Sequence, residues 1–228
     1  MTDAPADAPR RRALHGRSRG KALRPAQKAL LGAPLDAVRL RGVSRPENPG
    51  REPIPLPGEP LWVEIGFGGG EHLAYMARLH PEATILGAEP FVNGLASAMR
   101  QLGEAGVGNV RIHPGDALDL LEVLPAGSVS RAFLLYPDPW PKARHHKRRF
   151  VNPGPLGLLA RALAPGAEWR LATDIADYAE QALEEAGRAG FAPEADGAEP
   201  WADWTPTRYE AKALREGRAP RYLTFRRL

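Results

Sequence analysis

Residues 61–79 read LWVEIGFGGGEHLAYMARL, and this stretch indicates how the chain folds. Residues 61–67 are mostly apolar, as expected of a strand that is buried on both faces of a sheet. The glycines at 66–70 then allow a sharp turn. Apolar residues recur at helical spacing over 71–79, which predicts an amphipathic helix. A buried strand, a glycine turn and a helix together form the first half of a βαβ unit.

The same alternation continues along the chain. The further predicted strands are 83–88, 110–113, 129–136, 168–172 and 221–227, and the further predicted helices are 91–105, 119–124, 156–163 and 176–188. Alternating strands and helices favour a parallel sheet with right-handed crossovers, so we predict an open, doubly wound α/β fold. We expect the last strand, 221–227, to close the sheet.

The amino-terminal part differs in composition. No acid occurs between Asp7 and Asp36, and this interval carries Arg10, Arg11, Arg12, Arg17, Arg19, Lys21, Arg24 and Lys28. Gly16, Gly20 and Pro25 interrupt it, so we expect no helix there and predict a flexible basic arm over 1–31. Such an arm either solubilises the protein or contacts phosphates. Residues 32–60, rich in Pro and Gly, are predicted to connect it to an α/β domain over 61–228.

The overall composition limits the class of protein. The chain has 228 residues, of which 43% are hydrophobic and 25% charged, and it contains no cysteine. These values are ordinary for a soluble domain, and they exclude a disulfide framework and a thiolate metal site. No apolar run reaches the roughly 18–20 residues of a membrane span, and the amino terminus lacks the hydrophobic core of a secretory signal. We expect a cytoplasmic protein that binds neither a membrane nor a metal.

Acidic residues stand in or just after the predicted strands. They are Glu64, Glu89, Asp116, Asp138 and Asp174. The carboxyl ends of strands in an open α/β sheet meet at one edge, and ligands bind there. Any single acid in such a place is as often the N-cap of the next helix. The set as a whole predicts a ligand site.

The glycine loop and three of these acids indicate the kind of ligand. Gly66 and Gly68 permit close approach of the backbone to a ligand, but the match to a dinucleotide fingerprint is loose. Glu64 would repel a pyrophosphate. Glu89 is placed to bind ribose hydroxyls, and Asp116 to accept an adenine amino group. An adenosine with an ammonium, a carboxylate and no phosphate fits this pattern, as in S-adenosylmethionine.

Residues 133–151 read FLLYPDPWPKARHHKRRFV. Tyr136, Asp138 and Trp140 each precede a proline, which predicts extended or polyproline backbone for all three. An acid-free block of cations follows, consisting of Lys142, Arg144, Lys147, Arg148 and Arg149. A stiff loop with one carboxylate before a block of cations favours a polyanion whose base is held against a reactive centre. The alternative is a solvated basic turn, with Trp140 as a hydrophobic anchor.

Six segments resemble, in this order, the motifs of the bacterial tRNA (guanine-N7-)-methyltransferases. They are VEIGFGGG, GAEP, GDALDLL, YPDPWPKARHHKRRFV, ATDIADYAE and TRYEAKALREG, and the resemblance covers roughly residues 60–228. Two departures are Pro90 in GAEP and Tyr209 where Phe is common. The resemblance implies a Rossmann-like class I methyltransferase fold, with a mostly parallel sheet and an antiparallel last strand. It implies S-adenosylmethionine as methyl donor and a guanine in the tRNA variable loop (position 46 in the family) as substrate.

The resemblance also implies roles for individual residues. Glu64, Glu89 and Asp116 would bind the cofactor, together with Gly66 and Gly68 of the glycine loop, and Asp138 would lie at the methyl-transfer centre, beside the cofactor. The implied substrate contacts are Lys142, Asp174, Thr207, Arg208, Tyr209 and Glu210, and we add the cations Arg144, Lys147, Arg148 and Arg149 of the basic block. N7 of guanine carries a free lone pair, so no base is needed, and a carboxylate such as Asp138 can stabilise the charge that grows on the purine.

Three other interpretations stay open. The first is another class I methyltransferase that acts on RNA or on a small molecule, although a small-molecule enzyme has no use for two basic segments. The second is an RNA-binding protein that kept the fold and lost catalysis. The third, a nicotinamide oxidoreductase, fits the glycine loop least well. The sequence is compatible with a monomer or a homodimer.

Overall fold

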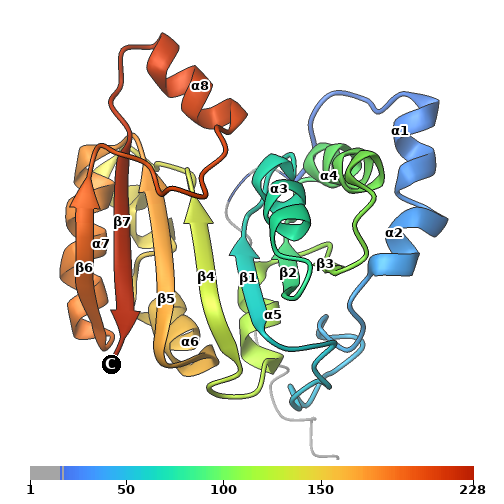
Figure 1. Ribbon diagram of the computed structural model, residues 1–228, viewed down its shortest axis with the longest axis horizontal. Helices are drawn as coiled ribbons and strands as arrows, with labels where there is room; N and C mark the ends of the chain where they lie inside the picture. The colour runs from blue at the N-terminus through green and yellow to red at the C-terminus, as the bar shows by residue number, and fades with distance from the viewer. Residues whose placement is uncertain (1–15, 17) are drawn as a thin grey trace, which may run out of the picture.

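The computed structural model describes Gly16 and residues 18–228. Seven strands form one sheet in the order β3-β2-β1-β4-β5-β7-β6 (Figure 1). The strands are β1 (Leu61–Ile65), β2 (Thr84–Ala88), β3 (Val110–His113), β4 (Val129–Leu135), β5 (Leu163–Thr173), β6 (Phe191–Gly197) and β7 (Arg221–Arg227). The helices are α1 (Pro25–Leu30), α2 (Ala33–Val38), α3 (Glu71–Leu79), α4 (Val92–Ala105), α5 (Ala117–Val123), α6 (Pro153–Ala162), α7 (Ala176–Arg188), α8 (Arg208–Arg215) and the 3-10 helix η1 (Ala143–Arg148).

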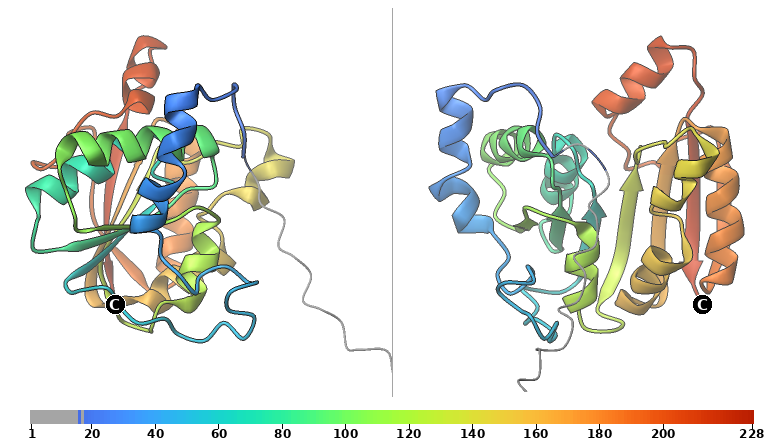
Figure 2. Two further views of the ribbon diagram at one scale, coloured as in Figure 1. Left: turned by 90° about the vertical axis from the view of Figure 1, so that its right-hand side faces the viewer. Right: turned by 180° about the vertical axis from the view of Figure 1, so that it is seen from behind.

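The predicted fold class is confirmed. Neighbouring strands from β3 to β5 are parallel, and β7 is antiparallel to both β5 and β6. Helices cover both faces of the sheet (Figure 2). This is the doubly wound arrangement, in which the carboxyl ends of the parallel strands meet at one edge.

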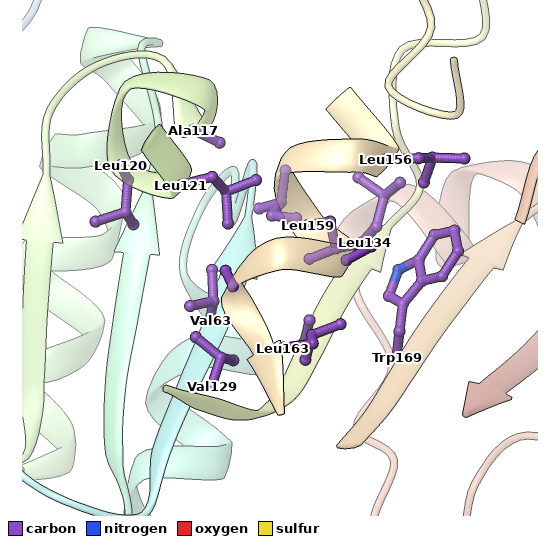
Figure 3. Packing of buried hydrophobic residues seen from close by; sticks show 14 of the residues in the cluster. Val63, Ala117, Leu120, Leu121, Val129, Leu134, Leu156, Leu159, Leu163 and Trp169 are labelled. Carbon is purple, nitrogen blue, oxygen red and sulfur yellow. The ribbon is translucent and has the colours of Figure 1, made fainter. Parts of the chain in front are cut away.

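Each face of the sheet carries its own core. Successive side chains of a strand point to opposite faces, so neighbours in β4 belong to different cores. Phe133 packs in the cluster that contains Leu73 of α3 and Met99 of α4. Leu134 packs in the cluster that contains Leu121 of α5 and Leu159 of α6 (Figure 3). The sheet is therefore held between two apolar layers, and its carboxyl edge is kept in a defined position.

The carboxyl-terminal part of the sheet corrects one prediction. The strand β7 does not close the sheet, because β6 lies outside it and forms the edge. The sequence of β6 did not predict a strand, since it contains Pro193 and most of its residues are exposed. Proline and charged residues are typical of edge strands, where they discourage pairing with other chains.

The described part of the amino-terminal segment also differs from expectation. Helix α1 begins at Pro25, which stands at its first position and so leaves the helix intact. The expectation of no helix in this interval is therefore wrong at 25–30. The cations Arg10, Arg11, Arg12 and Arg17 lie outside the described residues, and the boundary of the arm at 31 stays a prediction.

The connecting segment is tied to the α/β domain on the side of α5. Glu122 accepts hydrogen bonds from Arg45 at 2.8 Å and from Arg51 at 2.9 Å. The backbone N–H of Ile54 donates to the carbonyl oxygen of Val123 at 2.9 Å. Within the part of the chain that the structure describes, no helix has the length and apolar character needed to cross a bilayer.

Candidate active site

A cavity of about 1300 Å³ opens at the carboxyl edge of the sheet. Its lining includes the predicted site residues Gly66, Gly68, Glu89, Asp116, Asp138, Lys147, Arg148, Arg149 and Tyr209. The residues come from the ends of β1, β2 and β3, from the proline loop and the basic turn after β4, and from α8. Tertiary structure thus brings together most of the cofactor residues predicted from separate motifs.

Glu89 follows β2 and is the acid most tightly built into the cavity wall. Its carboxylate accepts hydrogen bonds from the backbone N–H of Gly68 at 2.7 Å and of Phe91 at 2.8 Å. Burial raises the pKa of Glu89, the nearby Asp138 charge acts in the same direction, and the two N–H donors act against the rise. Glu89 therefore links the glycine loop to the turn before α4.

Close packing of α4 on the glycine loop requires a glycine at position 94. A Cβ atom on Gly94 would lie 2.4 Å from the carbonyl oxygen of Gly68 and 3.4 Å from Cγ of Glu89. A backbone carbonyl cannot move aside as a flexible side chain can, so no side chain fits there. The wall beside Glu89 is consequently rigid.

Asp116 follows β3 and caps the next helix. Its Oδ1 accepts a hydrogen bond from the backbone N–H of Leu118 at 2.9 Å, at the start of α5. Asp116 thus has the N-cap role that is the alternative to ligand binding for each acid at the edge of the sheet. Asp116 also lines the cavity, so the cap fixes its carboxylate in the wall.

Glu64 is placed differently from the other acids. It is buried within β1, and its Oε2 lies 2.9 Å from Nδ1 of His72 in α3. It lines a second, much smaller space with Gly66, Thr207 and Tyr209. Glu64 is not among the residues that line the large cavity in the described chain, so its role toward the cofactor stays a prediction from the motif.

The proline loop after β4 has a different backbone from the one predicted. Tyr136 has φ of +49° and Trp140 φ of +44°, so the expectation of extended or polyproline geometry is wrong for both. Positive φ costs a non-glycine residue about 1–3 kcal/mol, and surrounding contacts must compensate for it. The backbone N–H of Tyr136 donates to the carbonyl oxygen of Ala172 at 2.7 Å, and the guanidinium of Arg148 lies 5.0 Å over the Trp140 ring. Asp138, between them, is exposed at the rim of the cavity.

Arg149, which is predicted to contact the substrate together with the other cations of the basic block, binds protein groups in this structure, so its contact with the substrate stays a prediction. Its side chain is 0% exposed. Nε donates to the carbonyl oxygen of Pro139 at 2.9 Å, Nη2 to Oδ2 of Asp177 at 2.8 Å and Nη1 to Oε1 of Gln181 at 3.0 Å. The guanidinium also lies 5.1 Å from the ring centre of Tyr178. Because protein groups satisfy this cation, it acts as the support of the proline loop.

Three other cations of the block are exposed to solvent, and the fourth faces the cavity. Lys142, Arg144 and Lys147 are exposed in and beside η1, and Arg148 is half-buried. No acid interrupts this turn. The exposed side chains therefore form a positive surface next to Asp138, as the basic block predicts.

Helix α8 begins next to the glycine loop and covers it. The residue Thr207 caps α8 by accepting a hydrogen bond from the backbone N–H of Glu210 at 3.2 Å. Arg208 donates to Glu71 at 2.8 Å and lies so close to Gly69 that a Cβ atom there would be 1.2 Å from Nη2. Tyr209 lies over Gly68 and lines the cavity. Figure 1 shows α8 beyond the arrowheads of β1 and β4.

Glu210 and Asp174, both predicted to contact substrate, bind protein groups in this structure. Glu210 is buried and accepts hydrogen bonds from Tyr222 at 2.6 Å and from Trp204 at 2.8 Å. Asp174 accepts one from Nε of Arg218 at 2.5 Å. Neither residue lines the large cavity within the described chain. These contacts anchor α8 and the segment after it, so substrate contacts by Glu210 and Asp174 stay a prediction.

Tyr178 is one of the residues of the cavity wall that sequence reasoning missed. Tyr178 is fully buried at the start of α7 and lines the cavity beneath the proline loop. Burial raises the pKa of its phenol, and the Asp138 charge acts in the same direction. The aromatic residue in ATDIADYAE was the only available signal, and it reads equally well as a core residue of an amphipathic helix.

Solved structures with a similar fold include two methyltransferases and a cyclase. The 16S rRNA methyltransferase KamB has a TM-score of 0.55 and 15% identity, covering 74% of this chain and 88% of that one. The aminoglycoside resistance methyltransferase NpmB1 has a TM-score of 0.54 and 16% identity, covering 83% and 98%. The [4+2]-cyclase SpnF has a TM-score of 0.53 and 18% identity, covering 75% and 76%. These neighbours define the fold as that of the class I methyltransferases, and SpnF illustrates that fold alone leaves the reaction open.

Comparison of the sequence with known proteins identifies the family of this chain. The family model described as "Putative methyltransferase" matches residues 58–221. The chain is 56% identical to the tRNA (guanine-N(7)-)-methyltransferase of Cereibacter sphaeroides, over 97% of this chain and 94% of that protein. It is 55% identical to that of Paracoccus denitrificans, over 96% of each. The chain belongs to the family of the tRNA (guanine-N(7)-)-methyltransferases, which confirms the resemblance of its motifs.

Proposed function

We propose that this protein transfers a methyl group from S-adenosylmethionine to N7 of a guanine in the variable loop of tRNA, giving 7-methylguanosine. The observation that carries the proposal is the near full-length identity of 56% to a curated enzyme of this name. The cavity supports it, because acids from three strand ends and an exposed basic turn meet at one place. Such a reaction belongs in the cytoplasm, where tRNA is found.

The residues at the cavity fit S-adenosylmethionine. Glu89 and Asp116 are carboxylates fixed in the wall, and carboxylates are suitable acceptors for ribose hydroxyls and an amino group. Gly66 and Gly68 leave the backbone of the loop open to close approach. We assign cofactor binding to these four residues and to Asp138. Among the described residues, no group of three or more His, Asp or Glu side chains could hold a metal ion.

The chemistry requires alignment more than acid or base catalysis. When bound, the cofactor supplies an electrophilic methyl group on a sulfonium. The bond from methyl carbon to N7 forms as the bond from carbon to sulfur breaks, and the positive charge passes from sulfur to the purine. No proton moves, because N7 presents a lone pair. Asp138 lines the cavity, which supports its assignment as the carboxylate that stabilises that charge.

The positive surface around the cavity supports binding of tRNA. Lys142, Arg144 and Lys147 are exposed on the turn that follows the proline loop, Lys147 lines the cavity together with Asp138, and Arg208 lies against Gly69 of the glycine loop. Phosphate contacts of this kind position a nucleic acid without reading its sequence. We assign Lys142, Arg144 and Lys147 to the phosphates, and Arg148, Trp140 and Tyr209 to the environment of the base.

The test is mass analysis of nucleosides from tRNA that was incubated with the protein and S-adenosylmethionine carrying a labelled methyl group. We expect the label in 7-methylguanosine from the variable loop. Label in another nucleoside would establish a different RNA methyltransferase. Tight binding of tRNA without any label would establish an RNA-binding protein that has lost catalysis.

A further inference from the structure

Gly16 and residues 18–21, here called the strap, are fastened to the first turn of α4. The side chain of Asn93 binds the strap on both sides of one peptide unit. Its Oδ1 accepts a hydrogen bond from the backbone N–H of Gly20 at 2.9 Å, and its Nδ2 donates to the carbonyl oxygen of Lys21 at 2.8 Å. The carbonyl oxygen of Ser18 accepts a third hydrogen bond, from the backbone N–H of Val92 at 3.1 Å. That N–H opens the helix and has no partner within it.

The strap also fits α4 closely in shape. A Cβ atom on Gly20 would lie 2.9 Å from Cζ of Phe91 and 2.9 Å from Oδ1 of Asn93. A side chain at position 20 would therefore displace the side chain of Phe91, the side chain of Asn93 or the strap itself. The attachment therefore depends on the identity of residues on both partners, Gly20 on the strap and Asn93 on the helix.

The attachment point is continuous with the proposed cofactor site. Phe91, against which Gly20 packs, donates its backbone N–H to the carboxylate of Glu89 at 2.8 Å and lines the cavity. At its other end the strap reaches the methyl-transfer centre. Gly16 lines the cavity, and a Cβ atom on it would lie 3.0 Å from Oδ2 of Asp138. Figure 2 shows this segment passing over the carboxyl ends of the strands before α1 begins.

We propose that the strap is a wall of the ligand cavity, that Asn93 is its positioning residue, and that docking of the strap and binding of the cofactor stabilise each other. The proposal rests on the proposed function, since it takes the cavity to be the cofactor site. A ligand that fills the cavity touches the strap only when the strap is docked, so it favours the docked state. By thermodynamic reciprocity, preventing the strap from docking must lower the affinity for the ligand by the same factor.

The coupling gives the basic arm a further role. The strap joins the arm to the domain, so a docked strap holds Arg19 and Lys21 near the cavity. Cofactor binding would thereby fix part of the tRNA-binding surface before tRNA arrives. A segment that merely rested on α4 would have no such dependence on the ligand.

Limited proteolysis with trypsin tests the coupling directly. Trypsin cleaves the bonds Arg19–Gly20 and Lys21–Ala22. The N–H of the first bond and the carbonyl of the second are the two groups that Asn93 holds. Cleavage therefore requires release of the strap, and its rate follows the population of the released state when opening is fast. The probe is S-adenosylhomocysteine, the thioether product, and mass spectrometry quantifies the two cuts.

We expect saturating S-adenosylhomocysteine to slow both cuts at least fivefold in the native chain. Asn93→Ala removes two hydrogen bonds, so without ligand it should be cut about tenfold faster. It should also bind S-adenosylhomocysteine several-fold more weakly in calorimetry, at an unchanged melting temperature. Gly20→Ala should reproduce both effects from the strap side. Gln101→Ala, which changes an amide on the same helix two turns away, is the matched control and should behave as the native chain.

Two results would overturn the proposal. One is binding of S-adenosylhomocysteine in calorimetry with no change in either cut. The other is native affinity in both Asn93→Ala and Gly20→Ala. Failure of the native chain to bind S-adenosylhomocysteine at all would instead overturn the assignment of the cavity to the cofactor, and the coupling with it.

Discussion

Nε of Arg149 donates a hydrogen bond to the carbonyl oxygen of Pro139, at 2.9 Å. A cation at the end of the basic block thus holds the loop that carries Asp138. Its other hydrogen bonds reach Asp177 and Gln181 of α7, so the loop is fixed to the helix that follows β5. Two neighbouring arginines consequently differ in role, because Arg148 faces the cavity while Arg149 lies beneath the loop.

Replacing Arg149 should destabilise the fold. Arg149→Met keeps most of the chain length but removes the hydrogen bonds to Pro139, Asp177 and Gln181 and leaves these acceptors without their donor. We expect the free energy of unfolding to fall by about 2–4 kcal/mol. Urea denaturation measures the loss. Arg144→Ala, an exposed cation in the same turn, should change the value by less than about 0.5 kcal/mol. Equal stability of the two variants would contradict the supporting role of Arg149.

Asp138→Asn should lower turnover while leaving tRNA binding nearly unchanged. The variant keeps the shape of the side chain but removes the charge that is proposed to stabilise the methylated purine, and we expect a loss on the order of a hundredfold in the rate. Single-turnover kinetics over a range of tRNA concentrations separate the rate from the affinity. Lys142→Ala with Arg144→Ala should do the reverse, because phosphate contacts act alike in ground and transition states. A normal rate for Asp138→Asn at saturating tRNA would reduce the proline loop to a docking surface.

Glu89→Ala should weaken binding of the cofactor. The carboxylate is proposed to accept hydrogen bonds from the ribose, and removing such a charged acceptor costs about 1.5–3 kcal/mol. The change also leaves the N–H groups of Gly68 and Phe91 without their acceptor, which loosens the same wall. Calorimetry with S-adenosylhomocysteine gives the affinity, and Glu104→Ala, an exposed acid of α4, serves as control. Native affinity in a folded Glu89→Ala protein would remove Glu89 from the site.

The protein should become less stable as the pH falls, because of His113. Burial lowers the pKa of this histidine from 6.5 to about 4. Between these values the unfolded chain binds a proton that the folded protein excludes, so the free energy of unfolding declines as pH falls through this window. A shift of this size corresponds to about 3 kcal/mol by pH 4. Denaturant curves at pH 7, 6, 5 and 4 measure the decline, and His113→Leu should make it shallower. An equally steep decline in His113→Leu would assign the effect to other groups.

Deleting residues 1–17 should flatten the salt dependence of tRNA binding. The deletion removes Arg10, Arg11, Arg12 and Arg17 but keeps residues 18–21 and their contacts with α4. Each phosphate contact contributes about 0.7–0.9 to the slope of log affinity against log salt, so the slope should fall by up to about 3. Filter binding over a range of salt concentrations measures it, with the melting temperature as control. An unchanged slope would make these cations a solubilising tail.

The sequence predicted most of the fold because the signals for it are local. Helices α3 and α7 and strands β3 and β7 have the predicted bounds, since apolar period, glycine turns and proline positions act within a few residues. The edge strand β6 escaped because an exposed strand has no apolar pattern. Helix α8 escaped because it buries few of its residues, Glu210 and Ala213. The helix is held by the hydrogen bond from Tyr222 to Glu210, 12 positions apart in the chain, and such a contact leaves no periodic apolar pattern in the sequence of the helix.

The sequence by itself determined which residues could serve methyl transfer, and the tertiary structure decided what each of them touches. Glu89, Asp116 and Asp138 were predictable at one edge because parallel strands end together. The burial of Arg149 could not be predicted, because it depends on acceptors in α7 that lie 28 and 32 positions further along the chain. The meeting of Gly20 with Asn93 likewise spans 73 positions. Contacts over such separations follow from the packing of whole elements, and no local property of the chain specifies them.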